Sequence, residues 1–349
     1  MATTVTIIDF LRSVAKMQTD VIDERCIKQF VQENKMKSYD HLLKQHKIKY
    51  LFLKKIIDFG LTEYVDFGLC YHHSCELVFL QQKYKEYLST IKKLTEELDR
   101  NQISYSILKG FSFIHDLYTE SNTIYRNFAD VDILISDENT GTVSKILNNL
   151  GFVQGYLDGS LLKPASRQEL IYWRLNSHQL HEFVKFSSYA HISPFLLTHI
   201  DINFTIFEGG KYSIPISTSE ILKHCDRRRI ADELYPCCLD YTYGLIQLCY
   251  HFYKDTVYDI KKETASDYVL IKFCDIREYI LNYRDLICWE EFIDVVTQAN
   301  IFKEIGFVLN MVSSFYGDLR IDNVLEMLHI DEVNFNWERL IGIIKEENQ

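Results

Sequence analysis

The sequence predicts an α+β fold in which a mixed β-sheet lies between two helical regions. Apolar residues recur at helical spacing on both sides of residues 101–215, whereas inside that range short apolar runs alternate with turn signals such as Asp158-Gly159. We therefore divide the 349 residues into an N-terminal helical region at 1–100, a sheet core at 101–215 and a C-terminal helical region at 216–349.

The bulk composition predicts a folded chain that does not hold nucleic acid. Hydrophobic residues make up 47% of the chain, which is enough to bury a sizeable interior. A net charge of −11 argues against general attraction to phosphate backbones, so a nucleic-acid partner is not expected.

Neither the start of the chain nor its apolar runs indicate export or a membrane. The first residues lack the basic and apolar regions of a signal peptide, and no apolar run approaches the roughly 20 residues that span a bilayer. The nine cysteines include no C-x-x-C pair and are interpreted as reduced thiols. We expect a cytoplasmic protein with no membrane partner, and the sequence leaves its oligomeric state open.

One long amphipathic helix is expected to end the N-terminal region. Its apolar residues are spaced three or four apart with Lys and Glu between them: Leu77, Leu80, Tyr84, Tyr87, Leu88, Ile91, Leu94 and Leu98. His72 and His73 precede this stripe. Adjacent helical residues do not face a common point, so structural or surface histidines are preferred there over a metal site.

The core region predicts alternating strands and helices. A strand at 104–108 is followed by a short helix around Phe111–Leu117 and a polar loop at Thr119–Thr123. The remaining elements are a strand at Asp130–Ile135, a turn at Asn139-Thr140-Gly141, a helix that stops at Gly151, and strands around Phe152–Tyr156, Phe183–Phe186 and Ile200–Phe207.

The chain after residue 216 is predicted to be mostly helical. Leu245, Leu248, Cys249 and Phe252 form one apolar stripe, and further stripes follow around Phe273 and Val295. Pro236-Cys-Cys is a hairpin-like interruption, and Arg227-Arg228-Arg229, beside acidic residues, is interpreted as a solvated helix end.

Three aspartates on predicted strands indicate metal chemistry. Asp130 and Asp132 are two positions apart, so their side chains project from one face of the strand. Like charges side by side are unfavourable unless a divalent cation lies between them. Asp201 stands on a later strand that alternates apolar and polar residues, where it shares a face with Asn203.

The order of these residues resembles the bacterial "uncharacterised nucleotidyltransferase" family, a branch of the DNA polymerase β superfamily. The resemblance is carried by Leu108-Lys109-Gly110 after a strand, Tyr118, Arg126 four residues before Asp130, the Asp130-Val-Asp132 pair and the Ile200-Asp-Ile-Asn-Phe204 strand. It extends to helical segments such as Ile271–Arg277 and covers most of the chain.

The resemblance implies a polymerase-β-like nucleotidyltransferase core that uses two Mg²⁺ ions, or Mn²⁺. Asp130, Asp132 and Asp201 would be the metal ligands and catalytic residues, with Asp201 orienting or deprotonating the acceptor. Lys109, Gly110 and Arg126 would hold the triphosphate, with Ser112 as the nearest hydroxyl.

The implied reaction moves a nucleoside monophosphate, which we expect to be AMP from ATP, to an acceptor with release of pyrophosphate. The acceptor would be a hydroxyl or phosphate of a small molecule, a peptide or a protein. Two positions depart from the pattern: Gly110 is followed by Phe111 where the superfamily has Gly-Ser, and Asn203-Phe204 stands where the family tends to have His-Trp.

Several alternatives stay open at this point. A catalytically silent nucleotide-binding or scaffold protein would keep the fold, whereas a kinase is disfavoured because the P-loop and the H-x-D-x-x-x-x-N loop do not occur. Lys109 would then cap a strand end, Arg126 would pair with Asp130 and Tyr118 would serve packing. Four histidines would be enough in number for a zinc site, but their spacing is not that of zinc ligands. They are therefore interpreted as loop or strand residues: His178, His181, His191 and His199.

Overall fold

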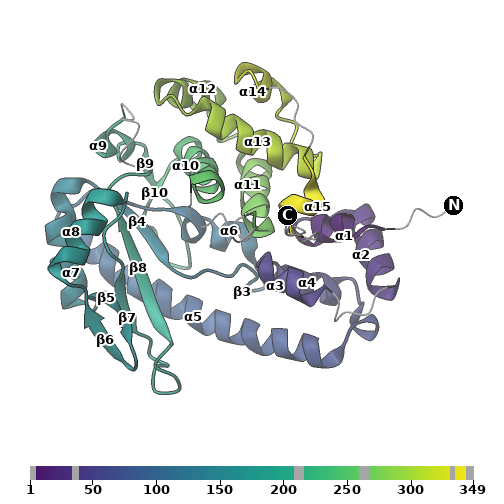
Figure 1. The fold of residues 1–349 in the computed structure, drawn as a ribbon, viewed down its shortest axis with the longest axis horizontal. Helices are drawn as coiled ribbons and strands as arrows, with labels where there is room; N and C mark the ends of the chain where they lie inside the picture. Colours follow the sequence, from purple (N-terminus) through teal and green to yellow (C-terminus); the bar gives the residue numbers. More distant parts are fainter. Residues whose placement is uncertain (1–4, 34–38, 208–215, 259–267, 331–334, 343–349) are drawn as a thin grey trace, which may run out of the picture.

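A mixed eight-stranded sheet organises the middle of the chain in the computed structural model, which describes residues 5–33, 39–207, 216–258, 268–330 and 335–342 (Figure 1). The strand order is β6-β5-β7-β8-β4-β1-β10-β9. Its strands are β1 Tyr105–Ile107, β4 Val131–Ile135, β5 Val153–Asp158, β6 Leu161–Pro164, β7 Phe183–Phe186, β8 Leu197–Asn203, β9 Cys225–Arg227 and β10 Cys237–Leu239. With helices before and after it, this sheet agrees with the predicted α+β class.

The central strands meet where the predicted aspartates lie. β4 is antiparallel to β1 and parallel to β8. The antiparallel pairing brings the end of β1 beside the beginning of β4, and the parallel register places Asp132 directly opposite Asp201.

Alternate residues of β4 face two different cores. Val131, Ile133 and Ile135 pack in a cluster with α5 (Phe67–Arg100) and α7 (Thr140–Asn149), whereas Leu134 packs with the C-terminal helices. Asp130 and Asp132 have the parity of Leu134. Their side chains therefore belong to the face that the C-terminal helices cover.

The N-terminal region is helical as predicted, with α1 Ile7–Val14, α2 Val21–Glu33, α3 Asp40–Gln45, α4 Lys49–Asp58 and α5. Figure 1 shows α5 running from the sheet to α3 and α4. This helix starts earlier than predicted, because Asp66 caps it by accepting a hydrogen bond from the amide of Leu69. His72 and His73 therefore lie inside the helix, and His73 is buried between Asp40 and Glu76.

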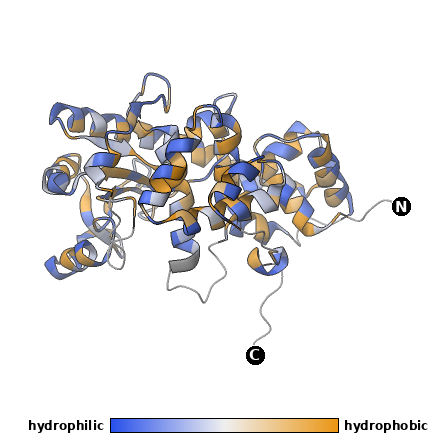
Figure 2. Ribbon diagram, turned by 90° about the horizontal axis from the view of Figure 1, so that it is seen from above, coloured by the Kyte–Doolittle hydropathy of each residue, from blue (hydrophilic) through white to orange (hydrophobic). Residues whose placement is uncertain are grey.

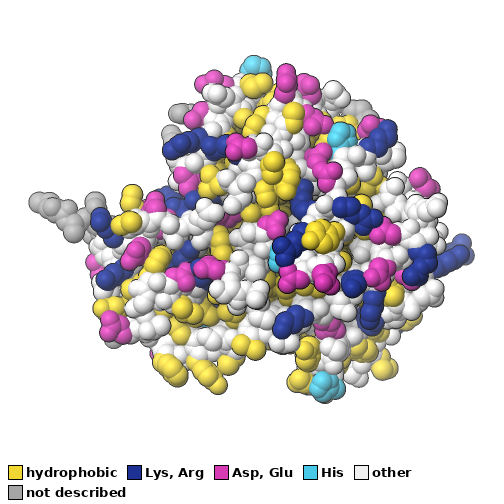
Figure 3. Space-filling view, turned by 180° about the vertical axis from the view of Figure 1, so that it is seen from behind, with side chains coloured by type: hydrophobic (Ala, Val, Ile, Leu, Met, Phe, Trp, Pro, Cys, Tyr) yellow, Lys and Arg dark blue, Asp and Glu magenta, His cyan; other side chains and the backbone are white. Residues whose placement is uncertain are grey.

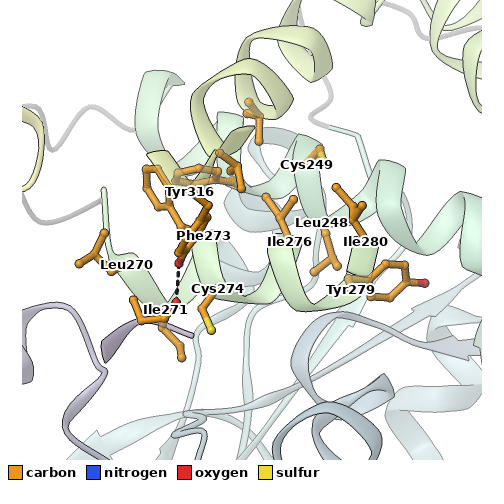
Figure 4. Close-up of a cluster of buried hydrophobic side chains, with 14 of the residues drawn as sticks. Leu248, Cys249, Leu270, Ile271, Phe273, Cys274, Ile276, Tyr279, Ile280 and Tyr316 are labelled. Carbon is orange, nitrogen blue, oxygen red and sulfur yellow. Dashed lines mark hydrogen bonds between the residues drawn. The ribbon is translucent and has the colours of Figure 1, made fainter. Parts of the chain in front are cut away.

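The C-terminal helices form the second large core, with α9 Thr218–Ile221, α10 Tyr241–Tyr253, η5 Lys254–Tyr258, α11 Leu270–Tyr283, α12 Trp289–Gln298, α13 Phe302–Tyr316, α14 Asp322–Met327 and α15 Trp337–Leu340. Figure 4 shows Leu248 and Cys249 of α10 beside Ile276 and Ile280 of α11. Helices in Figure 2 show hydrophobic and hydrophilic residues on different sides, as amphipathic helices that cover a core do.

The sheet continues past the predicted boundary at 215, which lies outside the described residues. β10 begins directly after the predicted interruption at Pro236 and pairs in parallel with β1, and β9 pairs with β10. The interpretation of Arg227-Arg228-Arg229 as a solvated helix end is wrong: Arg227 lies on β9, and Arg228 is buried with its guanidinium 4.0 Å from the centre of the Tyr241 ring.

The structure also adds elements that the sequence pattern did not predict. The polar loop at Thr119–Thr123 contains a small hairpin of β2 Thr119–Glu120 and β3 Thr123–Ile124. β6 and α8 (Arg167–Asn176) lie between β5 and β7, and α7 begins at Thr140, inside the predicted turn. The short helix after Gly110 is split into η3 Lys109–Ser112 and α6 Ile114–Tyr118.

The surface and helix lengths bear on possible partners. On the face drawn in Figure 3, side chains of both charge signs are interspersed, so this face has no continuous basic stripe. None of the helices in the described ranges has the length and apolar character needed to cross a membrane. All nine cysteines are free.

Candidate active site

Three aspartates gather on one face of the sheet. Asp130 immediately precedes β4, Asp132 is the second residue of β4, and Asp201 stands opposite Asp132 on β8. Partners in a parallel ladder project to the same side, so the structure brings the three predicted side chains to one site.

The negative charges of these three carboxylates repel one another. Burial, and then the charge of Asp132, raise the pKa of Asp130 above its ordinary value. Burial, with the charges of Asp132 and Asp130, raises the pKa of Asp201 to about 8. A hard divalent cation would relieve the repulsion between these carboxylates, and carboxylate oxygens are ligands that such cations prefer. These residues therefore fit Mg²⁺ or Mn²⁺.

A separate group of possible metal ligands lies away from the three aspartates. In the described ranges, the metal-ligating groups whose atoms all lie within 4.8 Å of one another are those of His224, Asp240 and Glu291. These three residues gather at the start of α10, where Asp240 caps the helix through the amide of Tyr243. Within the described residues, the carboxylate oxygens of Asp130, Asp132 and Asp201 do not all lie within this distance of one another.

Asp132 forms an ion pair with the amine of Lys109. Nζ of Lys109 lies 2.8 Å from Oδ1 of Asp132, and Nδ2 of Asn203 donates to the same oxygen at 3.2 Å. Burial alone would lower the pKa of Lys109, but the charges of Asp132 and Asp130 outweigh it and raise this pKa. The amine is thus paired at the site and is not the solvated strand cap that the sequence left open.

Gly110 and Arg126 are fitted to each other. A Cβ on Gly110 would collide with Nη1 of Arg126 and lie 2.9 Å from its Cζ. The guanidinium donates to both carboxylate oxygens of Asp275 on α11, with Nε at 2.7 Å and Nη2 at 2.6 Å. Its ion-pair partner is therefore Asp275, not the Asp130 that the sequence left open.

Tyr118 belongs to the same contact. It is fully buried, and its hydroxyl donates to Oδ1 of Asp275 at 2.8 Å. Burial, with the charge of Asp275, raises the pKa of Tyr118 well above its ordinary value. Two residues of the sequence signature, Tyr118 and Arg126, thus tie the sheet core to the C-terminal helices.

Ser112 stabilises the short helix η3, which also contains Lys109 and Gly110. Its hydroxyl donates to the carbonyl oxygen of Lys109 at 2.7 Å, and Lys109 itself has a positive φ of 51°. This short helix therefore places the amine of Lys109 beside Asp132, near the start of β4.

Sequence reasoning did not find a group of basic side chains beside Lys109. Lys254 lies 2.9 Å from Nε2 of His178, and Lys272 pairs with Asp255 at 2.7 Å. Burial, then the charges of Lys254 and Lys109, lower the pKa of His178 to about 3. Burial, then the charges of Lys272 and Arg126, lower the pKa of Lys47.

These basic residues come from α10–η5, α11 and the turn before α4, so no local motif joins them. The pKa of His251 on α10 is lowered by burial and then by the charges of Lys109, Lys254 and Lys272. We call Lys47, Lys109, Lys254 and Lys272 the lysine cluster. Its charges complement the nearby aspartates and suit an anion.

A cavity of about 450 Å³ opens beside two of the aspartates. It is lined by Asp130 and Asp201 together with side chains of α5 and of the segment between β7 and β8. Asp132, which is bonded to Lys109, is not part of its lining.

The predicted loop and strand histidines have separate partners. His199 contacts Glu182 at 3.0 Å, His191 contacts the carbonyl of Ser188, and His178 contacts Lys254. The ring of His181 packs edge-on against Trp173. Within the described residues these four histidines do not belong to a common group of closely spaced metal-ligating atoms.

Comparison with known proteins identifies one family. The model of the family described as "Uncharacterised nucleotidyltransferase" matches residues 32–317, which include every candidate site residue. No curated protein matches the chain.

Proposed function

The chain belongs to the uncharacterised nucleotidyltransferase family, and we propose that it transfers AMP from ATP to a hydroxyl or phosphate group of a small molecule, a peptide or a protein, with release of pyrophosphate. The observation that carries this proposal is the register of β4 and β8, which sets Asp132 directly opposite Asp201, with Asp130 immediately before β4. By analogy we regard the core as polymerase-β-like.

In this proposal Asp130 and Asp132 hold one divalent cation, and Asp201 joins them at a second. When bound, the two cations would activate the attacking oxygen and neutralise the leaving pyrophosphate. The raised pKa values of Asp130 and Asp201 support this assignment, because buried carboxyls that repel one another lose that repulsion when a cation binds.

The lysine cluster is proposed to receive the triphosphate. Lys109 lies on the turn after β1, in the short helix η3 that also contains Gly110 and Ser112. Arg126 contributes by supporting Gly110, since two of its nitrogens are committed to Asp275. This arrangement supplies positive charge where the Gly-Ser turn of the superfamily is missing.

The chemical step follows from these positions. The acceptor oxygen forms a bond to the α-phosphorus, while the bond from that phosphorus to the bridging oxygen breaks. The electron pair of that bond leaves with pyrophosphate, and the acceptor proton passes to Asp201.

Incubation with Mg²⁺ and each α-labelled nucleotide tests the proposal. We expect the wild type to bind ATP only with the metal and to release pyrophosphate, slowly with water as acceptor. Asp130→Asn and Asp132→Asn should each lose at least about 100-fold of this rate. Equal pyrophosphate release by wild type and variants, or no nucleotide binding at all, would falsify the proposed activity.

A catalytically silent scaffold is the second candidate, favoured by Asn203 at the position where His is usual. The side-chain amide of Asn203 donates a hydrogen bond to Oδ1 of Asp132. A silent protein would bind nucleotide equally well with Mg²⁺ and with EDTA, which a thermal-shift titration distinguishes.

A further inference from the structure

The cavity beside Asp130 and Asp201 has a rigid floor. The hydroxyl of Tyr87 on α5 donates to the carbonyl of Ala129 at 3.0 Å and accepts from the amide of His199 at 2.8 Å. One buried side chain thus holds together α5, the approach to β4 and the middle of β8. The two aspartates are fixed relative to this floor.

The polar side chains of the cavity are largely satisfied by the protein itself. Lys83 donates to the carbonyl of Phe128 at 2.7 Å, and burial lowers the pKa of Lys83 to about 8. Glu86 accepts from the hydroxyl of Ser187 and from the amide of Ser188, both at 2.7 Å. These contacts also fasten the segment between β7 and β8 onto α5.

What the cavity offers a ligand is therefore mainly aromatic surface. Phe79 and Phe195 are 41% and 74% exposed, and the ring of Tyr189 packs edge-on against Phe79 with centroids 6.4 Å apart. Leu196 and Leu197 add apolar lining. A volume of about 450 Å³ suits a drug-sized molecule and not a folded chain.

Two groups at the floor can orient a hydroxyl. Nδ1 of His199 contacts Glu182 at 3.0 Å, which leaves Nε2 as the ring nitrogen that can hydrogen-bond a ligand hydroxyl. His199 and Asp201 are two residues apart on β8, so they project to the same side. A hydroxyl between them would lie at the edge of the proposed reaction centre.

We propose that this cavity is the acceptor site and that the acceptor is a small molecule with an aromatic ring and a hydroxyl group. The ring packs against Phe79, Tyr189 and Phe195, and the hydroxyl lies between His199 and Asp201. This inference rests on the proposed nucleotidyl transfer, whose acceptor it names by chemical class.

Saturation-transfer NMR on the full chain tests the inference with phenol, cyclohexanol and glycerol as probes. We expect phenol to bind at millimolar concentration, cyclohexanol more weakly and glycerol not at all. Phe79→Ala/Phe195→Ala should weaken phenol binding roughly tenfold, because aromatic contacts are lost. Both side chains are exposed, so the variant should keep its fold.

Phe67→Ala/Tyr71→Ala is the matched control. Both rings lie on α5, the helix that also carries Phe79, and they are 81% and 63% exposed. Neither residue is part of the cavity lining. Equal weakening in both double variants, no preference of phenol over glycerol, or cyclohexanol binding as tight as phenol binding would each overturn the aromatic assignment.

The proposed function is tested separately in the same samples. Asp132→Asn should lose Mg²⁺-dependent ATP binding but keep phenol binding, since Asp132 does not line the cavity. Failure of the wild type to bind ATP with Mg²⁺ overturns the proposed function, and with it the acceptor role, even where phenol binds. ATP binding without phenol binding overturns this inference alone.

Discussion

At the scale of single residues, the site stores charge repulsion that a cation would relieve. Asp201 has a pKa raised to about 8, far above the ordinary value of an aspartate. The folded chain therefore binds a proton there more tightly than the unfolded chain does. Its contribution to the free energy of unfolding falls as pH rises from about 4 to about 8.

Asp201→Asn is expected to stabilise the metal-free protein by about 1–2 kcal/mol at pH 8, because the amide carries no charge. The gain should be smallest near pH 4 and grow up to about pH 8. Urea unfolding in EDTA at several pH values measures it, with the exposed Asp158→Asn as the control. Added Mn²⁺ should stabilise the wild type and not Asp201→Asn; a variant that is less stable in EDTA at every pH contradicts the prediction.

Gly110 offers a second test at residue scale. Gly110→Ala places a Cβ against the guanidinium of Arg126 and should cost roughly 1–3 kcal/mol of unfolding free energy. Gly141→Ala is the control, because a Cβ there meets nothing within 4 Å and the residue lies in α7. Chemical unfolding should show the control to be neutral or stabilised by about 0.5–1 kcal/mol. If the two variants were equally stable, the guanidinium of Arg126 would move aside at little cost in free energy, which would contradict the prediction.

The residues of the site differ in how far the sequence could predict them. Period-two alternation was enough to predict that Asp130 and Asp132 share a face, because a strand fixes that geometry locally. The position of Asp201 opposite Asp132 depends on the pairing of β4 with β8, which alternation does not give. The partner of Arg126 was not predicted, since Asp275 lies 149 positions away. A buried aspartate within the apolar pattern of α11 was the available signal.

At the scale of elements, the sequence predicted those that bury a regular apolar stripe. α5 and β4 show such stripes, whereas α8 has no buried residue and therefore no helical period to detect. β9 and β10 are three residues long, too short for alternation to stand out. The lysine cluster was missed because its members come from separate elements that only the tertiary fold brings together.

Among the contacts between elements, we expect the one between α11 and the sheet core to be the most sensitive to substitution. Asp275→Leu leaves the guanidinium of Arg126, whose side chain is only 13% exposed, without its partner and should cost about 3–5 kcal/mol. Arg126→Met/Asp275→Leu removes both charges and should recover much of this loss. Equilibrium unfolding of the single and double variants forms a double-mutant cycle. Additive losses would mean that the pair does not couple the two elements.

At the scale of the whole molecule, one residue joins the N-terminal helical region to the C-terminal helices. His46 follows α3 and is buried, its Nε2 lies 3.0 Å from the carbonyl of Ile341, and its own carbonyl accepts from the amide of Ile271. Residues far apart in sequence thus share one interior. This long-range packing is the part of the architecture that local sequence patterns do not encode.

His46 also makes the stability of the whole chain sensitive to acid. Burial lowers the pKa of His46 to about 4. As pH falls, the unfolded chain therefore binds a proton at this residue near pH 6.5, whereas the folded chain binds it only near pH 4. The stability that His46 contributes is complete above pH 6.5 and is lost as pH falls towards 4. Replacing it by Gln should reduce the pH slope of the unfolding free energy by up to about 1.4 kcal/mol per pH unit in this window.

Urea unfolding of the wild type and His46→Gln between pH 6.5 and 4 measures that difference in slope. Tyr39→Phe is the control, because it alters another buried polar group of the same core without removing a group that titrates in this range. The control should shift stability by a constant amount at every pH. Parallel curves for wild type and His46→Gln would place the acid sensitivity elsewhere, since only a group that titrates differently in the folded and unfolded chain can change the slope.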